Sequence, residues 1–251
     1  MLIRTILEYN SAGCLVYAAD YPGAAARGRS PAEAYAKLPD ELAHFSRWQR
    51  GSQPGEPFQG CGFFTVLAKD SPLHVEDADS DVIFPSERLP MTMEDYRQRK
   101  ALALRSAADF QALYDSVPDK SAPLAPVRES FYGPVPNTAE AMYQHTMCVN
   151  RYYFGEIGIE AENGPDILSC RARAFAALEQ QAGFLAAPAR TGSYDELWSL
   201  AKVLRRFLWH DRLHARAMYR RAAARFGSGI IADPFCFAAG PAGTEDRAAN
   251  P

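Results

Sequence analysis

The sequence predicts an α+β domain at the N-terminus followed by an all-α four-helix bundle. Two observations lead to this expectation: β-rich segments surround one well-marked helix in the first third of the chain, and four long segments with helical spacing of apolar residues follow without a strand between them. The chain has 251 residues, 47% of them apolar, which is enough for a core in each half. We place the domains at residues 1–85, with the linker included, and at 86–237, with a flexible tail at 238–251.

The first third of the chain reads as strands around a helix. Strands are expected at residues 2–8, 14–19, 59–68 and 81–84. Ser30 stands before Pro31, and Glu33 follows three residues after the serine, which is the arrangement of a helix N-terminus with a capping box. That helix should run to about residue 50, with Pro39 causing a kink or an early end.

Long helices are expected in the rest of the chain, at residues 92–117, 138–157, 165–185 and 193–226. Asn137 and Thr138 supply a cap for the second of them, and Gly227 closes the last. Helices of this length with no strand between them are typical of a bundle.

Composition narrows the classes of partner and location. The formal net charge of −3 argues against nucleic acid as a partner. No run approaches the roughly 18 apolar residues of a membrane span, and the first ten residues are too polar for a signal peptide. Five cysteines without a CxxC pair indicate reduced thiols. We therefore expect a cytoplasmic protein with no membrane partner.

Histidines give the first indication of chemistry. Only five occur, and His210 and His214 form an HxxxH pair on an expected helix. Residues four apart share a helix face, so both imidazoles can reach one metal ion. A solvated pair on an arginine-rich helix explains the same spacing.

A third histidine favours the metal site. His145 lies on a mostly apolar stripe with Met142, Val149 and Tyr152, which should face the protein interior. A core histidine bonded to a neighbour is the alternative. If His145 meets the HxxxH pair, the three imidazoles form a ligand set with positions left for water or substrate.

Residues 90–235 resemble a DinB-like metal-binding four-helix bundle. The segments that carry the resemblance are NTAEAMYQH at 137–145 and KVLRRFLWHDRLH at 202–214. In that family, a histidine inside the second helix and an HxxxH pair on the last helix bind a divalent metal. The resemblance therefore implies His145, His210 and His214 as metal ligands. Family members include metal-dependent hydrolases and enzymes that use low-molecular-weight bacterial thiols.

The identity of the ion and of further active groups stays open. Zinc suits three histidines best, and nickel, iron and manganese are also compatible with these ligands. Cys148 is either a fourth ligand or a small core residue. Glu140 and Glu156 are candidates for a general base. The alternatives are that Glu140 is the capping acid of its helix and that Glu156 is a surface residue at the helix end. The basic last helix is either a solvated face or a rim that binds anions.

Residues 2–65 resemble a HicB-like antitoxin domain, a small α+β fold, through DYPG at 20–23 and GRSPAEA at 28–34. No DNA-binding module follows it, so the resemblance implies a binding or scaffolding role; a purely structural appendage is the alternative.

Two functions follow as hypotheses. The first is a metal-dependent hydrolase or thiol-dependent transferase that acts on a small molecule, with an anionic thiol among the candidate substrates and a homodimer among the expected states. The second is a non-catalytic protein in which the HicB-like domain binds a partner.

Overall fold

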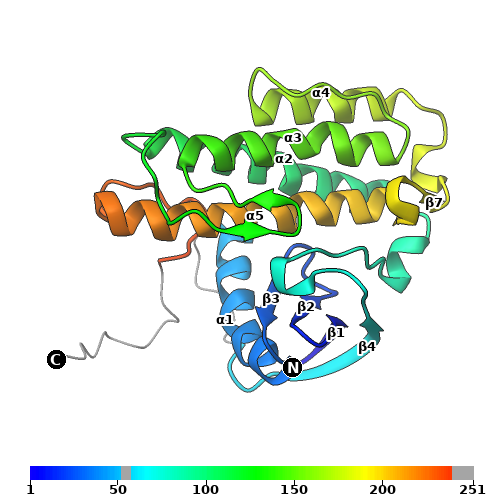
Figure 1. The fold of residues 1–251 in the computed structure, drawn as a ribbon. Coiled ribbons are helices and arrows are strands. Elements are labelled where there is room, and N and C mark those ends of the chain that lie inside the picture. Colours follow the sequence, from blue (N-terminus) through cyan, green and yellow to red (C-terminus); the bar gives the residue numbers. More distant parts are fainter. Residues whose placement is uncertain (52–57, 239–251) are drawn as a thin grey trace.

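A computed structural model describes residues 1–51 and 58–238 of the chain. Within these residues, a mixed four-stranded sheet and one helix come first, four further α-helices follow, and two short β-hairpins lie among those helices (Figure 1). The expectation of an α+β domain followed by an all-α four-helix bundle is therefore wrong, because strands also occur in the second part of the chain.

The sheet is built from β1 (Leu2–Tyr9), β2 (Cys14–Ala18), β3 (Ala25–Gly28) and β4 (Gly62–Asp70), in the order β3-β2-β1-β4. β1 is antiparallel to β2 and parallel to β4. A parallel pair needs a crossover connection, and α1 (Pro31–Gln49) supplies it. The expected strand at residues 81–84 does not form.

α1 begins where the capping box predicts. The Ser30 hydroxyl accepts a hydrogen bond from the Glu33 backbone N–H at 3.3 Å, and the Glu33 carboxylate accepts one from the Arg29 backbone N–H at 2.8 Å. The helix continues through Pro39 to Gln49, so the expected early end is wrong.

The four later helices are α2 (Met93–Ser116), α3 (Ala139–Glu156), α4 (Ile167–Glu179) and α5 (Leu200–Phe226). Each begins at a side chain that accepts a hydrogen bond from the backbone N–H three residues on: Thr92, Thr138, Asp166 and Ser199. α5 lies against α2 and α3, and α4 lies against the same two helices (Figure 1). None of the described helices is both long and apolar enough to cross a membrane.

Two short hairpins lie in the second part of the chain. They are β5 (Glu129–Ser130) with β6 (Gly133–Pro134), and β7 (Arg190–Thr191) with β8 (Leu197–Trp198). α4 ends at Glu179, before the expected residue 185. α5 starts seven residues later than expected, because β8 lies within the range predicted as helix. Tyr194 and Asp195 have φ angles of 59° and 56°, in the left-handed region, so the chain cannot be α-helical there.

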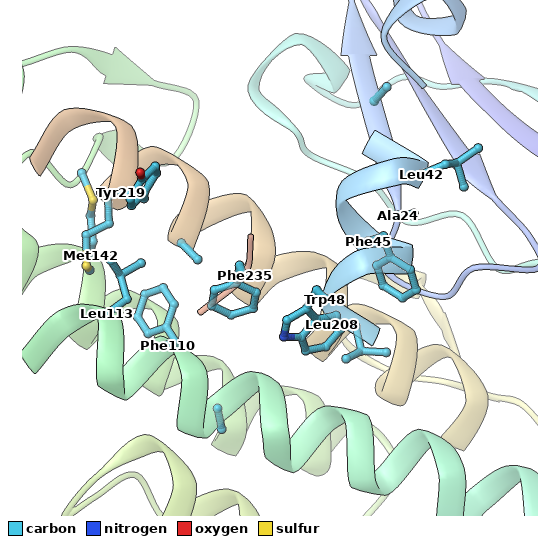
Figure 2. Packing of buried hydrophobic residues seen from close by; sticks show 14 of the residues in the cluster. Ala24, Leu42, Phe45, Trp48, Phe110, Leu113, Met142, Leu208, Tyr219 and Phe235 are labelled. Carbon is cyan, nitrogen blue, oxygen red and sulfur yellow. The ribbon is translucent and has the colours of Figure 1, made fainter. Parts of the chain in front are cut away.

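One hydrophobic cluster joins the front of the chain to the helices. Trp48 at the end of α1 lies beside Leu208 on α5, and Phe235 lies between Trp48 and Phe110 on α2 (Figure 2). Because the cluster contains residues from both sides of residue 85, the first helix and the later helices share a core. The division into domains at residue 85 stays a prediction, and the predicted tail lies, apart from residue 238, outside the described residues.

The connector between the sheet and α2, defined as residues 71–90, is held by α5. Three cations of α5 donate to the consecutive backbone carbonyls of residues 80, 81 and 82, at 2.6, 2.6 and 2.9 Å. In the order of these carbonyls, the donors are Arg206, Lys202 and Arg205. Lys202 and Arg205 are at most 2% exposed, so neither a solvated face nor an anion-binding rim describes this part of the helix.

Candidate metal centre

Three histidines from two helices meet at one point. His145 comes from the middle of α3, and His210 and His214 come from successive turns of α5. One nitrogen of each imidazole lies within 4.8 Å of those of the other two. The ring centroids are 5.2 Å apart for His145 and His210, 4.6 Å for His145 and His214, and 4.4 Å for His210 and His214. The expected convergence occurs, and the group is compatible with a metal site.

Neighbouring side chains fix the position of this group. The ring of Tyr153 packs edge-on against His210, with centroids 6.1 Å apart. Asp211, next in the chain, forms a fully buried ion pair with Arg171 of α4. The turn of α5 that carries His210 is therefore held from α3 and from α4.

The surroundings keep all three imidazoles neutral. Burial lowers the pKa of His145. Burial, followed by the neighbouring His214 and His145, lowers the pKa of His210 well below its ordinary value. Burial, His145 and the charge of Arg221 lower the pKa of His214 to about 3. The neutral imidazole is the form that binds metal, so no proton has to be displaced near neutral pH.

An unpaired nitrogen also fits a cation. Nδ1 of His210 is buried and has no hydrogen-bond partner among the described residues. Such an atom costs roughly 1–3 kcal/mol when nothing satisfies it. A divalent ion bound by the three imidazoles could satisfy it.

The other candidate residues lie outside this group. Cys148 is exposed, so it is not a core residue, and it is not among the residues that meet within 4.8 Å. Glu140 accepts hydrogen bonds from Tyr114 and Gln144. Glu156 is buried and accepts the Ser193 backbone N–H at 2.7 Å, so it is not a surface residue. Neither carboxylate has a contact with the histidines.

The hairpin β5–β6 lies over the histidines and was not expected. Tyr132 in its turn stacks on His145, with ring centroids 6.1 Å apart, and Phe131 stacks on His74 at 5.1 Å. In Figure 1 this hairpin crosses in front of α5. The only local sign in the sequence is Gly133, whose φ of 103° suits the turn.

Two hollows open beside α3. The smaller, of about 570 Å³, begins one turn after His145 and is lined by Cys148, Arg151, Tyr152, Gly155, Glu156, Arg190, Gly192 and Ser193. The larger, of about 1100 Å³, is lined by residues of α3, of α4 and of the chain between them. A histidine occurs in neither lining, so the smaller hollow adjoins the histidine group without enclosing it.

A comparison with family models, with curated proteins and with solved structures finds no match to this chain. The resemblances to DinB-like and HicB-like proteins therefore stay predictions.

Proposed function

We propose that the chain is a metal-dependent enzyme that binds one divalent cation on His145, His210 and His214 and acts on a small molecule. The observation that carries the proposal is the meeting of three imidazoles from two helices, with one nitrogen of each within 4.8 Å of the others. Burial, which lowers the pKa of all three, favours the neutral form that binds metal. Zinc is the first candidate because it favours nitrogen ligands and open three-histidine sites. Nickel, iron and manganese are the alternatives.

A divalent cation on three neutral ligands keeps its full charge and acidifies a water or thiol beside it, which supplies a nucleophile near neutral pH. Hydrolysis and thiol transfer are the two reaction classes that fit. The chain itself holds the imidazoles in place through α3 and α5, and Tyr132 covers one side of His145. The smaller hollow is within the size range of small-molecule sites, roughly 300–1,000 Å³.

Two further points belong to the proposal. The DinB-like resemblance of the histidine-bearing segments favours the same ligands. The five cysteines are free in the structure, which agrees with a reducing compartment, so we place the protein in the cytoplasm.

The test is the metal content of the purified protein. We expect about one divalent ion per chain in wild type by elemental analysis, and a large loss in His145→Ala and in His210→Ala. His44→Ala, a histidine outside the group, is the matched control and should keep the wild-type metal content. Reconstitution of the metal-free protein with each candidate ion then ranks their affinities.

Wild type that holds no metal after growth in metal-replete medium, and that takes up no added zinc, would remove the basis of this function. Full cellular activity of the triple histidine-to-alanine variant would instead favour the non-catalytic, partner-binding alternative.

A further inference from the structure

Most of the basic side chains on α5 have a partner. The helix carries eight of them, and six donate to a carboxylate or a backbone carbonyl: Lys202, Arg205, Arg206, Arg212, Arg216 and Arg225. The other two, Arg220 and Arg221, have no such partner within residues 1–51 and 58–238. Arg220 is exposed to solvent, whereas Arg221 is partly buried. The N–H donors of a partly buried guanidinium without a counter-charge stay available to an anion.

Arg221 stands on the same face of α5 as the histidines. It follows His214 by seven residues, which is about two turns, or roughly 10.5 Å along the axis. Long side chains on a helix lean toward its N-terminus, which for Arg221 is the direction of His214.

A second arginine lies at the base of the hairpin that places Tyr132 against His145. Arg128 precedes the hairpin β5–β6 and forms an ion pair with Asp77 at 2.7 Å. Burial lowers the pKa of Arg221, and the charges of Arg128 and Arg220 lower it further, with no acidic group among the causes. Positive charge therefore accumulates between the base of the hairpin and α5.

This positive region adjoins the histidine group. The hairpin that follows Arg128 places Tyr132 against His145, while Arg221 extends the face that carries His214. Arg128 and Arg221 thus belong to the two segments that carry Tyr132 and His214, the hairpin segment and α5. An oxyanion held between them would have the rest of its molecule beside the histidines.

We propose that Arg221, with Arg128 beside it, binds the oxyanion of the substrate, a carboxylate or a phosphate group, next to the metal centre. The guanidinium presents a planar fork of N–H donors that matches both groups. The inference rests on the proposed function and narrows it, because the substrate becomes a small anion whose reacting part lies near the metal.

The experiment uses the full chain loaded with Co²⁺, and titration calorimetry measures anion binding whether or not the anion coordinates the ion. Wild type, Arg221→Gln, Arg221→Lys and the control Arg220→Gln are each titrated with inorganic phosphate and, separately, with acetate. Cobalt stoichiometry is measured on every sample. Whichever anion binds wild type more tightly identifies the group that the site prefers.

We expect Arg221→Gln to weaken anion binding at least about tenfold at unchanged cobalt stoichiometry, because a charge-assisted hydrogen bond is lost. Arg221→Lys should lose less, since it keeps the charge without the fork, and Arg220→Gln should stay within about twofold of wild type. Equal affinity in Arg221→Gln and wild type would overturn the proposal. A loss of anion affinity in Arg190→Gln, a residue of the smaller hollow, without a loss in Arg221→Gln would also overturn the proposal.

Failure of the metal site would show separately. If wild type binds no cobalt, the proposed function falls, and the anion site is tested by calorimetric titration of metal-free wild type and Arg221→Gln with phosphate. A tenfold difference there supports the arginine site by itself, and equal affinities reject it.

Discussion

The buried ion pair between Arg171 on α4 and Asp211 on α5 fixes the helix turn that carries the histidines, so its removal tests what holds the site together. Both side chains are 0% exposed, and the pair is bidentate at 2.5 and 3.0 Å. Arg171 also donates to the side chain of Asn150 on α3 at 2.9 Å and to the Ala103 carbonyl on α2 at 3.0 Å. One guanidinium therefore connects four helices.

The structure gives the expected magnitude. Asp211→Ala leaves a buried guanidinium without its counter-ion, which should reduce the free energy of unfolding by about 3–5 kcal/mol. The double variant Arg171→Met, Asp211→Leu removes both charges and leaves mainly the Asn150 oxygen without its donor, a cost of about 1–3 kcal/mol. The double variant should therefore be more stable than the single one, by about 2 kcal/mol.

Urea unfolding at pH 7, followed by circular dichroism, measures both variants against wild type. Metal content measured on the same samples shows whether the histidines stay in place. A loss below 1 kcal/mol in Asp211→Ala would refute the reasoning, as would a double variant no more stable than the single one, because either result means that the charges are not coupled as the distances require.

Three further predictions concern the core and the sheet. Trp48→Ala should cost about 3–5 kcal/mol in thermal unfolding, since the ring is 0% exposed in the shared cluster, and a change below 1 kcal/mol would contradict that. Gly23→Ala should lower the free energy of unfolding by about 1–3 kcal/mol, because φ is +103° and the new Cβ would lie 2.6 Å from the Cβ of Leu208. Gly51→Ala is the control: φ is +73° and the surrounding space is open, so this variant has the backbone strain without the clash. Burial raises the pKa of Glu8, so the folded state holds this proton more tightly and wild-type stability should fall as pH rises from the ordinary value of 4.5 toward the raised pKa. Glu8→Gln should lack this decrease when melting temperature is measured from pH 4 to 8, and identical pH profiles would count against the assignment.

Local signals in the sequence predict the parts that depend on neighbours in the chain. The Ser30 capping box places the start of α1, and Thr138 places that of α3. The HxxxH spacing predicts a shared face for His210 and His214 because four residues make about one turn. His145 required one further assumption, that α3 packs against α5, and the structure meets it.

Features that depend on contacts between distant segments could not be predicted from the sequence pattern. Arg212 pairs with Glu41, a residue 171 positions earlier, so the spacing of cations on α5 could not show that they are buried. Two-residue strands are too short to give an alternating pattern, which is why the hairpin with Tyr132 was missed. The start of α5 was misplaced because the left-handed backbone at Tyr194 leaves no mark in composition.

The hydrogen bonds from α5 to the connector should make the connector sensitive to insertions and deletions. The acceptors are the main-chain oxygens of three successive residues, 80–82, and the donors are Arg206, Lys202 and Arg205. Every residue has a main-chain carbonyl, whatever its side chain. A conservative exchange such as Val82→Ile leaves all three acceptors in place. Removing one residue just before position 80 would move every acceptor by a step and present each cation with the wrong oxygen. During evolution, this stretch should therefore accept substitutions far more readily than insertions or deletions.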